Sequence, residues 1–403
     1  MHTTSTTIES KPAAHAAEAD QFQAGRVITV SAGHAIHDTY TAFLPSLLPL
    51  FIANLALSNT EAGLLTVFMQ GPSLLQPFIG HLADRFSLRT LFVLAPAVTA
   101  AMMSMLGVAP GYAAIALFLV IVGVSSACLH SIGPVIAGNV SGSSLGRGMG
   151  FWMVGGELGR TLGPIVVVTA VQLLTLGGTP WLMIAGLLTS AILFVQLRDV
   201  PNHAPNAGQG LPWRQALVHM RPLLIPLSGL IITRSFMVSA LTTYLPTFLS
   251  EEGADLWIAG ASLSILEGAG VVGALMGGTI SDRLGRRWVL LASMLATPLF
   301  MFVFLAVKGW FQFPLLLVLG FASLSVTPVI MALVQESFPE NRALANGVYM
   351  AISFVLRSGV IVVLGAMGDM FGLRTAFAAS AGIALLGLPL VLALPGSKVL
   401  NRE

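Results

Sequence analysis

The sequence Gly-His-Leu-Ala-Asp-Arg-Phe-Ser-Leu-Arg occupies residues 80–89, and a similar sequence, Gly-Thr-Ile-Ser-Asp-Arg-Leu-Gly-Arg-Arg, occupies residues 278–287. Each follows a long apolar segment, so an Asp-Arg pair stands at the same place after two hydrophobic stretches. Two membrane halves that carry equivalent turns are typical of secondary transporters, whose folds are built from structural repeats. The chain is therefore predicted to be built twice.

Other landmarks support this repeat. Residues 150–153 (Gly-Phe-Trp-Met) recur as residues 347–350 (Gly-Val-Tyr-Met), 197 positions later. The same offset carries Arg160 onto Arg357. Landmarks that keep one register indicate two equivalent halves.

The composition indicates an integral membrane protein. Of the 403 residues, 55% are hydrophobic and 9% are charged, and the mean hydropathy is +0.86. Soluble domains carry about 25% charged residues. A helix needs roughly 20 apolar residues to cross about 30 Å of hydrocarbon. Twelve membrane-spanning helices are predicted, at residues 26–53, 61–80, 90–107, 112–138, 147–172, 179–198, 221–249, 257–279, 287–307, 311–335, 343–367 and 375–395.

The predicted helices divide the chain into two halves with cytoplasmic ends. Residues 26–198 form the first six-helix half and residues 221–395 the second, joined by a cytoplasmic linker at 199–220 that is rich in Pro and Gly. We expect residues 1–25 to be a disordered cytoplasmic tail, since they lack the apolar core of a signal peptide. Residues 396–403 form a second short tail.

The positive charges support this orientation. With both termini inside, fourteen Lys and Arg residues lie in cytoplasmic segments, and only Lys308 and Arg374 lie in outer loops. This is the positive-inside bias of membrane proteins. It also accounts for the net charge of +2 without a nucleic-acid partner. Cys128 is the single cysteine, which excludes a disulfide within the chain and a cysteine-based metal site.

The predicted helix count, the repeat and the Asp-Arg turns resemble the major facilitator superfamily. A narrower resemblance is to the fosmidomycin resistance protein family of bacterial exporters. Glu157 and Arg160 depart from it, because they stand where that family is expected to have an uncharged amide and a small or apolar residue. The residues that carry the resemblance are His34-Ala-Ile-His37-Asp38, 73–77, 123–130, Gly155-Gly156, Leu158-Gly159, Gly163-Pro164 and Gln335-Glu336.

The resemblance implies an all-α transporter of the bacterial inner membrane that is a monomer, has no cofactor or metal and is not an enzyme. Its partners would be protons, the lipid bilayer and a small-molecule substrate. Helix 147–172 also resembles the antiporter motif of drug exporters, through Gly150, Gly159, Gly163 and Pro164. This favours export.

Ionisable residues inside the predicted helices are candidates for function. Each buried charge costs at least about 2.5–3.5 kcal/mol, so it needs a partner or a water-filled cavity. We predict a polar constellation between the two halves. It consists of Asp38, Glu157, Glu267, Arg160, Arg234, Arg357, His34, His37 and His130.

The acidic and histidine members are predicted to couple transport to protons. His34 and Asp38 are four residues apart and share one helix face, with His37 at its edge. Burial and nearby cations shift a carboxylate pKa in opposite directions, and imidazole titrates near about 6.5. The alternative is that Asp38 bridges helices without titrating. The predicted coupling residues are Asp38, His34, His37, Glu157 and Glu267.

The arginines are predicted to contact substrate. Arg160 and Arg357 are repeat equivalents near mid-membrane, so two guanidinium groups would clamp an anionic group. Alternatively, Glu157 simply neutralises Arg160, three residues away. Arg234 lies at the depth of the His34 turn in the other half, so it could pair with Asp38. Such a pair would either be broken by substrate or a proton during transport, or be a static ion pair that locks one closed state. Further expected lining residues are His130, which the resemblance places near His34, and Gln70, Tyr40, Tyr244 and Trp152.

Two other groups have structural roles. The resemblance implies conformational gating by the Asp-Arg turns and their neighbours, namely Asp84, Arg85, Asp282, Arg283, Arg286, Arg287 and Glu336. Gly155, Gly159 and Gly163, with Pro164, are spaced for close helix packing.

These features favour a proton-coupled antiporter that exports a small organic compound by alternating access. A proton symporter or anion exchanger for uptake is the alternative, since the arginines suit it equally well. No Walker lysine loop is present to bind ATP. A membrane receptor without transport and a membrane metalloenzyme remain as remote alternatives.

Overall fold

The computed structural model describes residues 21–83, 86, 88–142, 144–200, 213–338 and 342–394. Every regular element in these ranges is helical. The predicted tails, apart from residues 21–25, and most of the predicted linker lie outside the described residues, as do Asp84 and Arg85.

Two breaks mark the first helices of the chain. A single residue, Ala42, separates α2 from α3, and the 3-10 helix η1 separates α4 from α5 at Gly71-Pro72. Proline lacks the amide proton that continues a helix ladder, which accounts for the second break. The elements are α2 (Ala24–Thr41), α3 (Phe43–Leu55), α4 (Asn59–Gln70), η1 (Gly71–Leu75), α5 (Gln76–Ala83), α6 (Arg89–Met105), η2 (Leu106–Val108), α7 (Tyr112–Asn139), α8 (Leu145–Leu174), η3 (Leu176–Leu182) and α9 (Met183–Gln196).

The later helices repeat part of this pattern. A π-helical turn, η4, interrupts the first of them just before Pro246. The elements are α10 (Trp213–Ser239), η4 (Ala240–Tyr244), α11 (Leu245–Glu251), α12 (Leu256–Leu284), α13 (Arg286–Ala306), η5 (Gly309–Phe311), α14 (Gln312–Leu324), α15 (Val326–Ser337), α16 (Arg342–Phe371), α17 (Leu373–Leu385) and α18 (Gly387–Ala393).

Ten stretches in the described part of the chain are long and apolar enough to cross a membrane. They correspond to the third through twelfth predicted helices. The predicted helices at 26–53 and 61–80 are instead divided, into α2 with α3 and into α4 with η1 and α5. The ten stretches support a multi-pass membrane protein.

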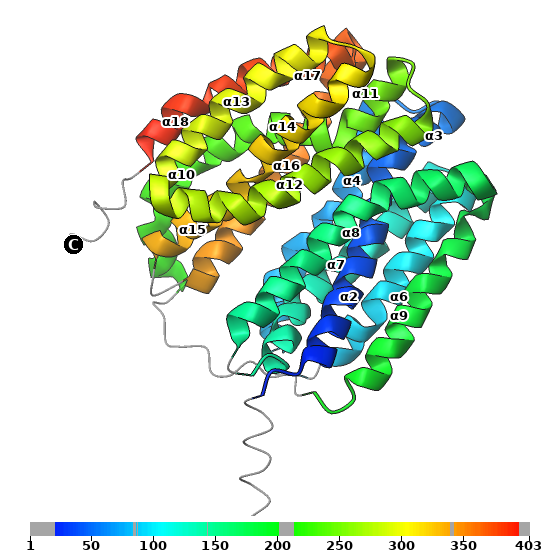
Figure 1. Cartoon of the computed structure of the whole chain (residues 1–403), viewed down its shortest axis with the longest axis vertical. Helices are drawn as coiled ribbons and strands as arrows, with labels where there is room; N and C mark the ends of the chain where they lie inside the picture. The colour runs from blue at the N-terminus through cyan, green and yellow to red at the C-terminus, as the bar shows by residue number, and fades with distance from the viewer. Residues whose placement is uncertain are drawn as a thin grey trace, which may run out of the picture.

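The helices form two groups that meet along a few elements (Figure 1). The first contains α2 to α9 and the second α10 to α18. Between the groups α8 packs against α12 and α4 packs against α16. Each group has its own buried apolar clusters, with Leu44 and Phe92 among the members in the first and Phe248 and Phe377 among those in the second.

Polar contacts join the two groups where α4 begins and α16 ends. The Asp369 carboxylate of α16 accepts hydrogen bonds from the backbone N–H groups of Asn59 at 2.6 Å and Thr60 at 3.0 Å, and from the Thr60 hydroxyl at 2.6 Å. The Tyr244 hydroxyl lies 3.1 Å from the Asn59 carbonyl oxygen and 3.0 Å from that of Ile361. We call this end of the molecule the closed end.

Candidate functional site

Helices α8 and α2 pack closely together, and this contact positions the polar side chains described below. A Cβ atom on Gly155, Gly159 or Gly163 would lie 2.3 Å from a backbone oxygen of α2, so a side chain there would force the helices apart. The three oxygens belong to Ser31, Ala35 and Thr39, which have the same four-residue spacing. Gly156 leaves room for the polar groups, since its Cβ would lie 2.5 Å from His34 Cε1. Pro164 is buried on the same helix.

Asp38 lies at the centre of a buried polar cluster. Its side chain is 4% exposed, and its Oδ1 lies 2.9 Å from His37 Nδ1 and 3.7 Å from His130 Nε2. Its Oδ2 lies 3.4 Å from His34 Nε2 and 3.8 Å from a terminal nitrogen of Arg160. One carboxylate therefore faces three imidazoles and one guanidinium. We call these five residues the Asp38 cluster.

The outer nitrogens of two imidazoles are fixed by backbone carbonyls. His34 Nδ1 lies 2.9 Å from the Trp152 oxygen, and His130 Nδ1 lies 2.9 Å from the Ser126 oxygen. A carbonyl only accepts hydrogen bonds, so each Nδ1 must carry the proton and donate it. In the neutral form of each ring, Nε2 is then a lone-pair acceptor.

These two Nε2 atoms face one another at 3.3 Å, beside the Asp38 carboxylate. Three acceptors at such distances repel unless a proton lies among them, because a hydrogen bond needs one donor. The arrangement therefore provides a place for one proton that either imidazole or the carboxylate can hold. The same groups, His34, Asp38 and His130, have their ligand atoms within 4.8 Å of one another, a spacing that would also admit a metal ion. The Arg160 cation 3.8 Å from Asp38 opposes a second, multivalent cation there.

Arg160 connects the Asp38 cluster to other acidic groups. It forms an ion pair with Glu157 on the same helix, and it also interacts electrostatically with Glu267 of α12, across the boundary between the two groups. The side chain of Arg160 is 44% exposed and that of His130 is 32% exposed, while Asp38 and His34 are almost fully buried. The cluster thus reaches the surface through Arg160 and His130.

The two other arginines lie in the second group of helices. One terminal nitrogen of Arg234 donates to the Ser323 carbonyl and to the Thr327 hydroxyl, both at 2.9 Å. Arg357 donates to the Thr242 hydroxyl at 2.8 Å. Among the described residues, neither lies within ion-pair distance of a carboxylate, although Glu267 interacts electrostatically with Arg357.

Two predicted contacts are therefore absent from this structure. The expected Asp38–Arg234 pair is not formed, because Asp38 faces Arg160 of its own half and Arg234 points to α14 and α15. Equivalent depth in two helices does not fix which way each side chain rotates. The expected clamp of Arg160 and Arg357 is also not assembled, since Arg160 is held by carboxylates.

The predicted aromatic lining residues are mostly buried. The Trp152 ring stacks on His34 with centroids 3.8 Å apart, so this residue orients His34 through both its ring and its carbonyl. Tyr40 donates to the Leu182 carbonyl, and Tyr244 belongs to the closed end. Gln70 is partly buried, and its side-chain oxygen has no hydrogen-bond partner among the described residues.

The second Asp-Arg turn forms a compact ion-pair network. Arg286 lies 2.5 Å from the Asp282 carboxylate and 2.7 Å from that of Glu336, which links α12, α13 and α15. Arg287 donates to the Leu392 and Leu394 carbonyls at the end of α18. Arg283 is exposed in the last turn of α12. The equivalent turn in the first half, Asp84-Arg85, lies outside the described residues.

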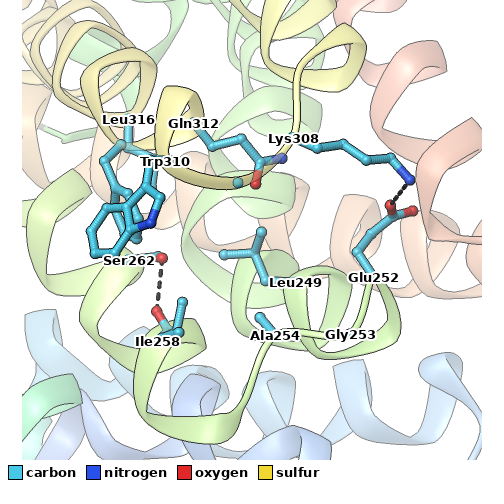
Figure 2. A pocket seen from close by; sticks show the side chains of 12 residues that line it. Leu249, Glu252, Gly253, Ala254, Ile258, Ser262, Lys308, Trp310, Gln312 and Leu316 are labelled. Carbon is cyan, nitrogen blue, oxygen red and sulfur yellow. Dashed lines mark hydrogen bonds and ion pairs between the residues drawn. The ribbon is translucent and has the colours of Figure 1, made fainter.

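A separate cavity of about 300 Å³ lies between α11, α12 and α14 (Figure 2). It is lined by apolar side chains such as Leu249 and Leu316, with Trp310 and the Lys308–Glu252 ion pair at its edge. Arg374 donates two hydrogen bonds to Glu252, and this holds the pKa of the Glu252 carboxyl below its ordinary value. None of the residues predicted to carry transport lines this cavity.

Several functional contacts escaped the sequence reasoning. The Trp152 and Ser126 carbonyls that set the histidine tautomers are backbone groups, which no side-chain pattern reveals. Asp369 was missed as well, because it follows the predicted span 343–367, and an acidic residue outside the membrane carries no cost that would signal a role.

The family comparison agrees with the arrangement of helices. The model of the Major Facilitator Superfamily matches residues 30–355 and 269–402 of this chain. The fosmidomycin resistance protein of Escherichia coli strain K12 is 24% identical over 379 residues, which cover 92% of each chain. The uncharacterized MFS-type transporter YfnC of Bacillus subtilis strain 168 is 25% identical over 397 residues, covering 93% of this chain and 94% of its own.

Solved structures share the fold at low sequence identity. A bacterial homologue of the human lysosomal transporter Spinster, in an inward-facing and occupied conformation, superposes with a TM-score of 0.78 at 15% identity, covering 92% of this chain and 97% of its own. A D-xylose-proton symporter superposes with a TM-score of 0.72 at 18% identity, with the same coverage. At these identities the likeness establishes the fold alone.

Proposed function

The chain belongs to the major facilitator superfamily, and from that premise we propose that it is a proton-coupled antiporter that exports a small organic compound. The observation that carries the coupling is the pair of facing Nε2 atoms beside the Asp38 carboxylate. The similarity to the E. coli fosmidomycin resistance protein over 92% of the chain supports efflux.

We further propose twelve spans in two six-helix halves, 26–198 and 221–395, with both termini in the cytoplasm of a bacterium. The broken pairs α2–α3 and α4–α5 supply the two spans beyond the ten long apolar stretches. In this topology the closed end faces the periplasm, and the structure represents an inward-facing state. The transporter would act as a monomer in the inner membrane.

The proposed cycle exchanges a proton for substrate at the Asp38 cluster. A proton from the periplasm would bind among His34, His130 and Asp38 and cancel one negative charge. Arg160 would then lose attraction to Asp38, 3.8 Å away, and remain with Glu157. Because Glu267 interacts with Arg160 across the boundary between the halves, this change in charge reaches α12. Release of the proton to the cytoplasm would restore the original pairing.

A second candidate is uptake of an organic anion by symport or exchange. Arg357 favours an anionic substrate, because this arginine donates to a hydroxyl and has no carboxylate within ion-pair distance in the described residues. A guanidinium with free donors suits a phosphonate or carboxylate. Symport would use the same coupling site as antiport, with the substrate moving in the opposite direction, whereas anion exchange would move no proton.

Transport in proteoliposomes would separate these candidates. The purified protein would be reconstituted with a pH-sensitive dye inside, and phosphonates, carboxylates and cationic drugs would be added under a defined pH gradient. Antiport predicts proton movement opposite to the substrate, and symport predicts movement in the same direction. Equal dye responses with and without every substrate, in vesicles of verified orientation, would contradict a coupled transporter.

The closed end gives a prediction about conformation. Replacing Asp369 by Ala removes the carboxylate that accepts three hydrogen bonds from Asn59 and Thr60. This should destabilise the closed end by about 1.5–3 kcal/mol, since hydrogen bonds to charged groups are stronger than those between neutral groups. Spin labels on Cys introduced at Asn54 and Phe371, in a Cys128→Ala background, would report the separation of α3 and α16. In Asp369→Ala, we expect a larger fraction of the molecules to show a long distance between the two labels.

The control for this experiment is Asp199→Ala, since Asp199 is an exposed carboxylate that follows the end of α9 and is not one of the residues that form the closed end. It should leave the distance distribution unchanged. If Asp369→Ala also leaves it unchanged, Asp369 is not a latch between the halves.

A further inference from the structure

A small cavity of about 10 Å³ lies inside the second group of helices, among α10, α13, α14 and α17. It has room for about one water-sized group. Its polar lining is Arg234, Ser293, Thr297 and Ser323, and its remaining walls are apolar. None of the Asp38 cluster contributes to it.

Three polar atoms of these lining residues are buried and have no partner among the described residues. They are Arg234 Nε, Thr297 Oγ1 and Ser323 Oγ. The fourth, Ser293 Oγ, donates to the Ala322 carbonyl at 2.6 Å. Buried polar atoms in proteins are nearly always hydrogen-bonded, so three unpaired atoms around one small cavity indicate a shared partner.

The charge of Arg234 indicates what that partner is. Its terminal nitrogen donates to the Ser323 carbonyl and the Thr327 hydroxyl, and it forms no ion pair with any acidic side chain that the structure describes. A guanidinium inside a membrane-spanning helix needs a counter-charge or water. An N–H and two rotatable hydroxyl groups can all donate to the same negative centre.

We propose that this cavity binds one monatomic anion, which is chloride in the cell, held by Arg234 Nε and by the hydroxyls of Thr297 and Ser323. The volume excludes phosphate, carboxylates and organic substrates, and the guanidinium excludes cations. The site lies within one half of the molecule and is independent of the proton site at Asp38. It supplies the missing counter-charge for Arg234 in the membrane.

Thermal unfolding of the purified full chain tests this site. The midpoint would be measured in sodium gluconate with increasing chloride or bromide at constant ionic strength. A ligand that binds only the folded protein raises stability by RT ln(1 + [L]/Kd), so binding predicts a saturable rise of a few degrees with either halide. Thr297→Val, which keeps the side-chain shape, should remove the halide response. Ser323→Ala should weaken it.

The matched control is Ser380→Ala, because Ser380 is a buried hydroxyl of the same half that bonds to the Ala376 carbonyl and does not line the cavity. This variant should respond to halide as the wild type does. An equal midpoint in all salts would show that the cavity takes water only. A halide response that is the same in Thr297→Val would assign it to another site, and either result would overturn the proposal.

Discussion

Replacing Asp38 by Asn should reduce substrate-driven proton flux in proteoliposomes to below about a tenth of the wild-type value. The reason is that the neutral amide, unlike the carboxylate, cannot bind and release a proton. The carboxylate is the one acidic group within 4 Å of His34, His37 and His130 in the described structure. The amide has nearly the same shape, so the fold should be retained. Substrate exchange in the absence of a pH gradient separates the coupling role from a packing role, since coupling alone predicts that exchange survives.

A second variant sharpens this experiment. Glu157→Gln removes the other carboxylate that binds Arg160 and leaves the three imidazoles around Asp38 unchanged. It should reduce flux less than Asp38→Asn. Undiminished proton flux in Asp38→Asn would remove Asp38 from the coupling path and leave it as a bridge between helices.

Replacing Gly159 by Ala should lower the free energy of unfolding by about 2 kcal/mol or more, since the overpacked methyl group forces α2 and α8 apart. The new Cβ would lie 2.3 Å from the Ala35 carbonyl oxygen and 2.8 Å from Asp38 Cβ. The intrinsic helix preference for Ala over Gly acts in the opposite direction by about 1 kcal/mol. The measurements are the thermal midpoint and the yield of monodisperse protein in detergent.

Gly150 on the same helix is the matched control. A Cβ at Gly150 meets no atom within 4 Å, so Gly150→Ala should be neutral or slightly stabilising. If both variants unfold at the same temperature, the close approach of α8 to α2 does not limit stability. The position of the Asp38 cluster would then not depend on this contact.

The fold was largely predictable because its signals are local. Hydrophobic length located ten of the spans, and the two Asp-Arg turns indicated the family. The first two spans were predicted as continuous helices, but Ala42 and Gly71-Pro72 divide them. Such a break depends on how neighbouring helices satisfy the freed backbone groups, and length and hydropathy carry no information about this.

The site was predictable where spacing along one helix decides it. His34 and Asp38 share a face, and Glu157 pairs with Arg160 three residues later. Contacts between different helices were harder to predict from the sequence. The depth of Arg234 was inferred from the repeat, yet its rotation toward Ser323 could not be, and the expected pair with Asp38 is not formed.

The first turn of α4 has its hydrogen bonds supplied by two different parts of the molecule. Ser58 accepts from the backbone N–H of Glu61, whereas the backbone N–H groups of Asn59 and Thr60 donate to Asp369 of the opposite half. One part of this helix cap is therefore local to the α4 sequence, and the other part requires contact between the two groups of helices. When the closed end opens, these two N–H groups would lose their bonds to the Asp369 carboxylate and donate to water instead. Hydrogen exchange at Asn59 and Thr60 would then report the opening of the closed end without any label or substrate.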